Sequence, residues 1–222
     1  MLEHTRQGPW LPISDPWRQV TSCLDQFITK FTQSRKDQDW VVFIDTNPAL
    51  TVYTEMALAA ADRLIVPCSA DVYSKQALSV LFWMVYGIES PRGFLLNAVT
   101  YKEESQKHTT RTPKIQLIVN NRHTIYGTRA AKAFLGVSSE ITATAYSAYQ
   151  KKKECFVDLD GHICRDSEDF RIRYTCQTRD FHTTGVVAMR HGQPFYSIKG
   201  ATRKPEIDSS LESIQKLVQM LP

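Results

Sequence analysis

Short apolar runs alternate along this chain with segments whose apolar residues recur at helical spacing. The runs lack polar alternation and are rich in β-branched residues, which is typical of strands covered on both faces of a parallel sheet. They occupy residues 41–44, 63–67 and 115–119. Helical spacing predicts helices at residues 16–32, 51–62, 74–88, 128–135, 183–189 and 209–221. Strands separated by helices indicate an α/β fold with a doubly wound, mostly parallel sheet.

Several segments carry a weaker pattern. Residues 138–150 fit a helix, although the stretch at 141–145 fits a strand equally well. The polar residues 102–113 are expected to form an exposed loop, and residues 193–198 are strand-like. The helix beginning at residue 128 is expected to stop at Gly136, because glycine commonly ends helices.

Residues 151–174 interrupt the alternation of strands and helices. Short apolar stretches at 156–158 and 171–174 flank a polar segment that contains Asp160-Gly161. An Asp-Gly pair between apolar stretches is a signal for a tight turn. The pattern therefore predicts a β-hairpin or an inserted loop at 151–174.

Composition limits the class of protein. At 222 residues and 42% hydrophobic content, the chain can bury one sizeable core. The net charge of +4 permits a nucleic-acid or acidic partner without arguing for one. Five cysteines without a CxxC pair fit reduced thiols. Because no apolar run approaches the roughly 20 residues that span a bilayer, and the start lacks the apolar core of a signal peptide, we expect a cytoplasmic protein with no transmembrane segment.

Asp45 is the most informative single residue. It directly follows the apolar run at 41–44 and precedes Thr-Asn-Pro. Open α/β sheets bind ligands at the carboxyl ends of their strands, and a carboxylate there commonly holds Mg²⁺ beside nucleotide phosphates. The alternative is a buried strand that ends in a turn-forming Asp-Thr-Asn-Pro.

Three segments, taken in order, resemble the ParA/MinD family of P-loop ATPases, which carry a deviant Walker A motif and position plasmids, chromosomes and other cargo. Residues 42–67, which begin Val-Phe-Ile-Asp-Thr-Asn-Pro, look like the Walker B strand, its helix and the next strand. Leu117-Ile-Val-Asn-Asn-Arg is similar to the strand whose terminal Asn-Arg contacts adenine. Residues 178–195 are similar to the late loop beside the nucleotide, the helix after it and a Gly-Gln-Pro turn. The resemblance covers residues 40–222 and implies a P-loop NTPase-like fold.

The resemblance implies a set of site residues. Asp45 would be the catalytic Walker B carboxylate, which acts on Mg²⁺ through water. Asn121, or else Asn120, would read the adenine edge through its amide, and Arg179 and Asp180 would line the base pocket. ATP and Mg²⁺ are the cofactors that the family uses. Each residue also has a plainer explanation: a turn for Asp45, a loop for the Asn pair and a surface ion pair for Arg179 and Asp180.

The chain departs from the family at the phosphate-binding loop. A P-loop needs glycines whose neighbouring N–H groups wrap phosphates, and a lysine that neutralises them. None of the nine glycines is followed by lysine, and Gly8, the only one before Gly87, precedes a proline. The Walker A loop is therefore missing, so ATP binding is doubtful, enzymatic activity is uncertain and no ATP hydrolysis is expected from this chain alone.

The departure extends beyond the loop. In the family, the Walker B strand lies beside the strand of the phosphate loop, whereas the 38 residues before Asp39 predict only coil and one helix. Residues 41–44 would then keep unpaired backbone groups, each at a cost of a few kcal/mol in an apolar setting. We expect residues 1–39 to form an irregular segment plus one helix, and 40–222 to form an ATPase-like domain that is incomplete at its amino-terminal side. The chain is either a fragment of a longer ATPase or a degenerate relative.

The resemblance also suggests partners. A homodimer, non-specific DNA and a cargo or adaptor protein are the partners that the family implies, and Lys199, Arg203 and Lys204 are the candidate DNA-binding residues. A solvated basic face is the alternative for that group. The second function that we consider is a non-catalytic interaction module that uses the apolar residues 81–85 or an exposed sheet edge.

A Cys/His group in the second half of the chain raises the question of metal binding. Its members are Cys155, His162, Cys164 and Cys176. Their spacing matches no common zinc pattern, since structural zinc sites favour close cysteine pairs. Reduced thiols are the preferred interpretation.

Overall fold

A computed structural model describes residues 15–47, 49, 51–69, 71–89, 98–123, 128–179, 181–197 and 204–221. The chain divides into two compact units, of which the first comprises residues 1–64 and 81–114 and the second residues 65–80 and 115–222. The predicted boundary between residues 39 and 40 stays a prediction. Each unit is described by itself below.

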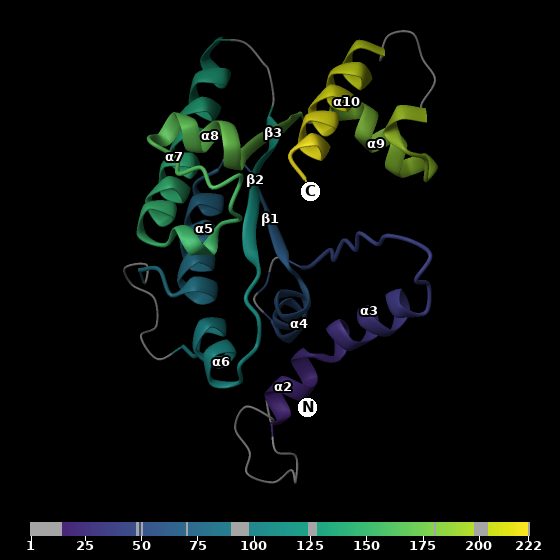
Figure 1. Ribbon diagram of the computed structural model, residues 1–222. Helices are drawn as coiled ribbons and strands as arrows, with labels where there is room; N and C mark the ends of the chain where they lie inside the picture. The colour runs from purple at the N-terminus through teal and green to yellow at the C-terminus, as the bar shows by residue number, and fades with distance from the viewer. Residues whose placement is uncertain are drawn as a thin grey trace. The chain divides into compact units, whose positions relative to one another are not determined.

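The second unit is built on a parallel sheet of three strands in the order β1-β2-β3 (Figure 1). The strands are β1 (Arg63–Ser69), β2 (Lys114–His123) and β3 (Thr175–Arg179). Strand β2 pairs with β3 from Ile118 opposite Thr175 to His123 opposite Arg179, with an irregularity after Asn120. The sheet and its flanking helices confirm the predicted α/β, P-loop NTPase-like fold with an incomplete sheet. Pro67 is accommodated because β1 lies at the edge of this described sheet, where no N–H is required.

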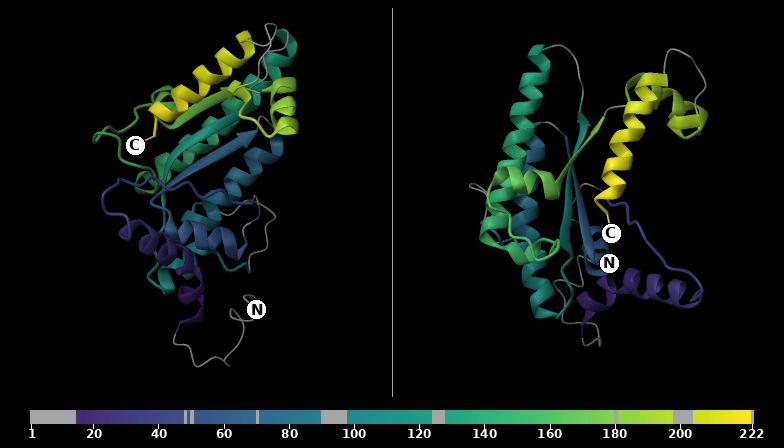
Figure 2. Two further views of the ribbon diagram at one scale, coloured as in Figure 1. Left: turned by 90° about the vertical axis from the view of Figure 1, so that its right-hand side faces the viewer. Right: turned by 45° about the horizontal axis from the view of Figure 1, so that its top comes forward.

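Helices cover both faces of this sheet. Helices α7 (Thr128–Lys151) and α8 (Ser167–Tyr174) lie on one side, and α10 (Lys204–Gln219) lies on the other (Figures 1 and 2). On the α10 side, Leu117, Val119 and Cys176 form a buried cluster with apolar residues from the end of the chain. On the α8 side, the rings of Tyr149, Phe156, Phe170 and Tyr174 pack together, with centroids 5.1 to 5.7 Å apart.

Local sequence explains where the helices of the second unit begin and end. The carboxylate of Asp166 accepts hydrogen bonds from the N–H groups of Glu168 and Asp169 and so starts α8. Helix α9 (His182–His191) ends at Gly192, whose φ of 58° is left-handed. Two short 3₁₀ turns, η1 (Lys153–Cys155) and η2 (Phe195–Ser197), join the larger elements.

The first unit is helical in its described part. It contains α2 (Pro16–Thr21), α3 (Cys23–Gln33), α4 (Val52–Ala60), the end of α5 (Val72–Tyr86) and α6 (Tyr101–Lys107). Asp15 caps α2, with Pro16 as its first residue. Thr100 and Glu103 form a reciprocal capping box at the start of α6.

The predictions from apolar runs and helical spacing are confirmed for most elements. The strands at 63–67 and 115–119 and the helices at 51–62, 74–88, 183–189 and 209–221 are present, with small differences at their ends. The helix predicted at 16–32 is interrupted at Ser22 and forms α2 and α3. Residues 138–150 are helical, which decides between the two alternatives.

Four local predictions are wrong. Helix α7 continues through Gly136, because glycine weakens a helix without ending it when the flanking residues favour helix. Of the two alternatives for 151–174, the hairpin is wrong, since residues 171–174 lie in α8, whereas residues 157–166 form an irregular loop with a turn at Asp160-Gly161. Residues 101–107 form α6 rather than an exposed loop. Residues 195–197 form a 3₁₀ turn rather than a strand.

Candidate functional site

Asp45 lies in an extended segment outside the described sheet. Residues 41–47 have no assigned secondary structure, and Asp45 is exposed. The prediction that residues 41–44 form a strand covered on both faces is therefore wrong: Val41 and Phe43 are each 71% exposed. The physical reason is the missing neighbour, because a strand needs a second strand to satisfy its backbone groups. The magnesium role of Asp45 stays a prediction.

Asn120 and Asn121 occupy the carboxyl-terminal half of β2 and belong to opposite faces of the sheet. Successive residues in a strand point to alternate faces. The amide Oδ1 of Asn121, an exposed residue, accepts a hydrogen bond from the hydroxyl of Thr178 on β3 at 3.0 Å. Asn120 is 5% exposed and lies opposite Gln177. The two residues proposed to contact adenine therefore lie in different environments, Asn120 buried and Asn121 exposed.

Arg179 ends β3, at the same end of the sheet as Asn121. Its backbone N–H donates to the hydroxyl of Ser213 on α10 at 3.3 Å, and that hydroxyl donates to the carbonyl of Ser210. The structure thus brings Asn121 and Arg179 to the carboxyl ends of neighbouring parallel strands, which is where α/β folds place ligands. Asp180 lies outside the described residues. The nucleotide-binding roles of Asn121, Asn120, Arg179 and Asp180 stay predictions.

A polar cavity of about 300 Å³ lies on the opposite face from Asn121. Its lining comes from β2, β3, α7 and α8. The lining residues are Asn120, Leu135, Ser138, Ser139, Thr142, Ser167, Glu168, Arg171, Thr175 and Gln177. Within the described residues, the Oδ1 atom of Asn120 accepts no hydrogen bond. Buried amide oxygens normally accept a hydrogen bond, so Asn120 offers an acceptor at this cavity.

The candidate DNA-binding group is only partly described. Lys199 and Arg203 lie outside the described residues. Lys204 begins α10, and only its backbone is described. The proposed contact with DNA therefore stays a prediction.

The Cys/His group does not converge on one point. Cys176 belongs to the buried cluster on the α10 side, whereas the backbone N–H of Cys164 donates to the hydroxyl of Tyr149 on the α8 side. His162 contacts the carboxylate of Asp169 at 2.7 Å. Burial raises the pKa of the Cys164 and Cys176 thiols, which disfavours the thiolate that binds metals. Among the described residues, no three His, Cys, Asp or Glu side chains could hold an ion together.

The Asp169 carboxylate is the centre of a small ionic group. Hydrogen bonds from His162, from the backbone of Arg165 and from Arg173 lower the pKa of Asp169 to about 2. Because the folded-state pKa is lowered, its stabilising contribution is complete above the ordinary value of about 3.9 and is lost as the pH falls from about 4 towards 2.

We expect Asp169→Asn to reduce the pH dependence of stability in that window. The measurement is the urea midpoint of the parent and the variant at several pH values from about 2 to 6. Above pH 5 the variant should be the less stable of the two, and the two curves should converge as the pH falls. Parallel curves across the window would contradict the assignment.

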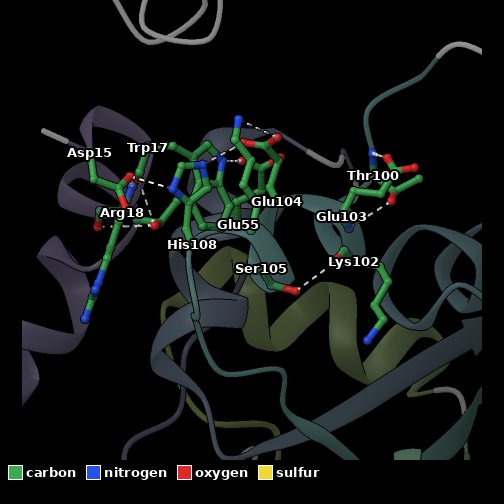
Figure 3. A network of polar contacts seen from close by, with 12 residues as sticks. Asp15, Trp17, Arg18, Glu55, Thr100, Lys102, Glu103, Glu104, Ser105 and His108 are labelled. Carbon is green, nitrogen blue, oxygen red and sulfur yellow. Dashed lines mark hydrogen bonds and ion pairs between the residues drawn. The ribbon is translucent and has the colours of Figure 1, made fainter.

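A second polar group, in the first unit, was not found by sequence reasoning (Figure 3). The ring of His108 contacts the carboxylate of Asp15 at 2.7 Å and that of Glu104 at 3.4 Å, and it stacks on Trp17 with centroids 5.1 Å apart. The indole N–H of Trp17 donates to Glu55 at 3.1 Å. The sequence signal nearest to this group is the capping box Thr100-x-x-Glu103. It marks the start of helix α6, which carries Glu104 and ends directly before His108.

This group ties α2 to α4 and to His108, which directly follows α6. Burial by itself would raise the pKa of Asp15, but the N–H of Arg18 and the ring of His108 outweigh burial and lower it. The hydroxyl of Ser105 on α6 donates to the carbonyl of Lys102 (Figure 3). Its contacts join residues of packed elements to one another, and we therefore expect the group to stabilise the first unit.

Comparison with known proteins supports one part of the resemblance. Residues 18–92 match a family model described as an AAA domain, which is a P-loop ATPase-related domain. No curated protein and no solved structure matches the chain. In the described part of the chain, no helix is both long and apolar enough to cross a bilayer.

Proposed function

We propose that this chain is a ParA/MinD-like positioning ATPase domain that lacks its phosphate-binding loop and does not hydrolyse ATP by itself. The proposal is carried by one observation: within the region that matches an AAA domain, the Walker B-like segment ending in Asp45 is exposed and outside the described sheet. In the part of the chain that the structure describes, no strand pairs with this segment, and no glycine of the sequence is followed by the lysine that a phosphate loop needs.

The residues present do not fit Mg-ATP. A triphosphate needs a nest of backbone N–H groups and a lysine, and no glycine of this chain is followed by lysine. Asp45 is exposed to solvent, and no three His, Cys, Asp or Glu side chains that the structure describes could hold an ion together. We therefore derive no catalytic step through ATP or Mg²⁺.

The part of a nucleotide site that this chain would retain is the part that contacts the adenine base. Asn121 and Arg179 lie at adjacent strand ends, and an amide can offer both a donor and an acceptor to an adenine edge. The Oδ1 atom of Asn121 accepts a hydrogen bond from the Thr178 hydroxyl at 3.0 Å, which fixes the orientation of the amide at this strand end. We propose weak binding of the base, without the phosphate contacts that supply affinity in complete P-loop ATPases.

A specific observation favours the second candidate function, a non-catalytic interaction module. The exposed apolar residues 40–43 provide a surface that a single soluble domain rarely leaves open. The helix segment 81–85 does not serve this purpose as fully as expected, because Phe82 and Val85 are buried. A cargo or adaptor protein, a second copy of the chain and non-specific DNA remain proposed partners, and the cytoplasm remains the proposed location.

We expect the purified full chain to release phosphate from Mg-ATP no faster than buffer does, and Asp45→Ala to make no difference. The measurement is a coupled phosphate assay on both proteins at equal concentration. Turnover above buffer that is lost in Asp45→Ala would overturn the proposal. Calorimetry with Mg-ATP separates the two candidate functions: heat with a stoichiometry near one favours a retained nucleotide site, and its absence favours the interaction module.

A further inference from the structure

The residues between α3 and α4 include an extended apolar segment that has no ladder partner among the described residues. Residues 40–44 read Trp-Val-Val-Phe-Ile, and the exposed side chains include Trp40, Val41, Val42 and Phe43. The backbone N–H and C=O groups of residues 41–44 make no hydrogen bond to any described residue. An extended, exposed run of this composition is the kind of edge that natural proteins cover or protect with charge.

Helix α3 extends this apolar surface. None of its residues is buried, and Phe27 and Phe31 are exposed on it. The ring of Phe31 meets that of Trp40 edge-on at 5.2 Å, and the Trp40 indole N–H donates to the carbonyl of Arg35 at 3.2 Å. Residue 40 is therefore held against the end of α3, which positions the residues that follow it.

Charge surrounds the apolar segment. Asp39 and Asp45 stand immediately before and after it, and both are exposed. Opposite charges placed across neighbouring strands stabilise a pair, and like charges directly opposite destabilise it. A strand that covers residues 40–44 is thus favoured when it carries a basic residue at each end.

The same charges argue against a second copy of this segment as the occupant. An antiparallel pair centred on Val42 would set Asp39 of one copy opposite Asp45 of the other. A parallel pair in register would set each aspartate beside its own counterpart. Both arrangements that pair the whole segment therefore place like charges opposite each other.

We propose that residues 40–44 accept a β-strand from a different polypeptide, one whose apolar, β-branched core is flanked by lysine or arginine. Addition of a strand satisfies the backbone groups of the segment through main-chain hydrogen bonds, while the side chains and the flanking charges select the partner. Residues 40–44 are apolar at every position, so the strand they form has two apolar faces, as a strand inside a sheet does. This partner rests on the second candidate function, the interaction module, and does not depend on nucleotide binding.

The test uses the full chain and a synthetic peptide, acetyl-KVIVIVK-amide, with acetyl-EVIVIVE-amide as the matched control. The readout is the hydrogen exchange of backbone amides in residues 39–46, followed by mass spectrometry. At about 1 mM peptide, the basic peptide should slow exchange in this segment by about tenfold or more, and the acidic peptide should have little effect. The double variant Asp39→Lys, Asp45→Lys should reverse the preference of the segment for the two peptides.

Three results would overturn the proposal. The first is unchanged exchange in residues 39–46 at the highest concentration of basic peptide. The second is equal protection by both peptides, which would leave the aspartates without a role. The third is slow exchange before peptide is added together with a dimer in sedimentation, which would make a second copy the occupant. None of these outcomes depends on the phosphate assay, so the two proposals fail separately.

Discussion

Replacement of Phe170 by alanine is expected to lower the free energy of unfolding of the second unit by about 3–5 kcal/mol. Phe170 lies on α8 and is fully buried. Its ring contacts those of Tyr149, Phe156 and Tyr174, with centroid distances of 5.4, 5.7 and 5.1 Å. A fourth ring, that of Tyr146, lies 5.6 Å from Phe170. The alanine variant loses this apolar burial and leaves a cavity that the four aromatic neighbours cannot readily fill, since rigid rings adjust poorly to a void.

The measurement for Phe170→Ala is urea unfolding followed by far-UV circular dichroism. Ile172→Ala is the matched control, because Ile172 belongs to the same helix and is 62% exposed; its effect should stay within about 0.5 kcal/mol. All four tryptophans, at positions 10, 17, 40 and 83, fall in the sequence ranges of the first unit, so dichroism is a better probe of the second unit than tryptophan fluorescence. A loss below about 1 kcal/mol in the dichroism transition would contradict the packing assigned to Phe170.

The second large effect is expected for Trp17→Ala, at about 3–5 kcal/mol on the first unit. Trp17 is 6% exposed, stacks on His108 and lies 6.0 Å from the ring of Tyr101. Its indole N–H also donates to the buried carboxylate of Glu55. Alanine removes both the packing that joins α2 to α6 and the donor that faces Glu55 on α4.

Trp17→Phe separates the two contributions. Phenylalanine keeps most of the packing and removes only the N–H, so we expect a smaller loss of about 1–3 kcal/mol, the usual consequence of withdrawing one partner from a buried polar group. Tyr53→Ala on α4 is the matched control, because Tyr53 is 70% exposed and its removal should change stability by less than about 0.5 kcal/mol. Dichroism is the suitable probe, since both Trp17 variants lose a fluorophore. Equal losses for Trp17→Ala and Trp17→Phe would place the whole effect on the hydrogen bond and contradict the packing argument.

The elements predicted most accurately are those whose signal is local. The helix at 51–62 and the strand at 63–67 follow from residue type and spacing alone. The polar composition of residues 102–113 predicts a loop, whereas the capping box Thr100-x-x-Glu103 is the local signal for helix α6. For residues 171–174 the apolar pattern predicts an arm of a hairpin. The Asp166 cap is the local signal that these residues belong to a helix.

The candidate site shows the limit of residue spacing. Asn120 and Asn121 are neighbours of the same residue type, so the sequence does not distinguish them. Because successive residues of a strand point to opposite faces, Asn120 lines a polar cavity and Asn121 contacts Thr178. The group formed by Asp15, Trp17 and His108 joins residues about 90 positions apart, and no local pattern predicts such a contact. Both arrangements depend on which faces the packed elements present to one another.

By itself, the sequence determined the α/β class, most helices, two of the strands and the lack of a glycine-lysine phosphate loop, because each depends on residues that are near one another in the chain. Only the tertiary structure decided that residues 41–44 remain outside the described sheet. Their composition suits a buried strand, but a strand becomes stable through hydrogen bonds to a neighbouring strand, and composition alone does not supply that neighbour.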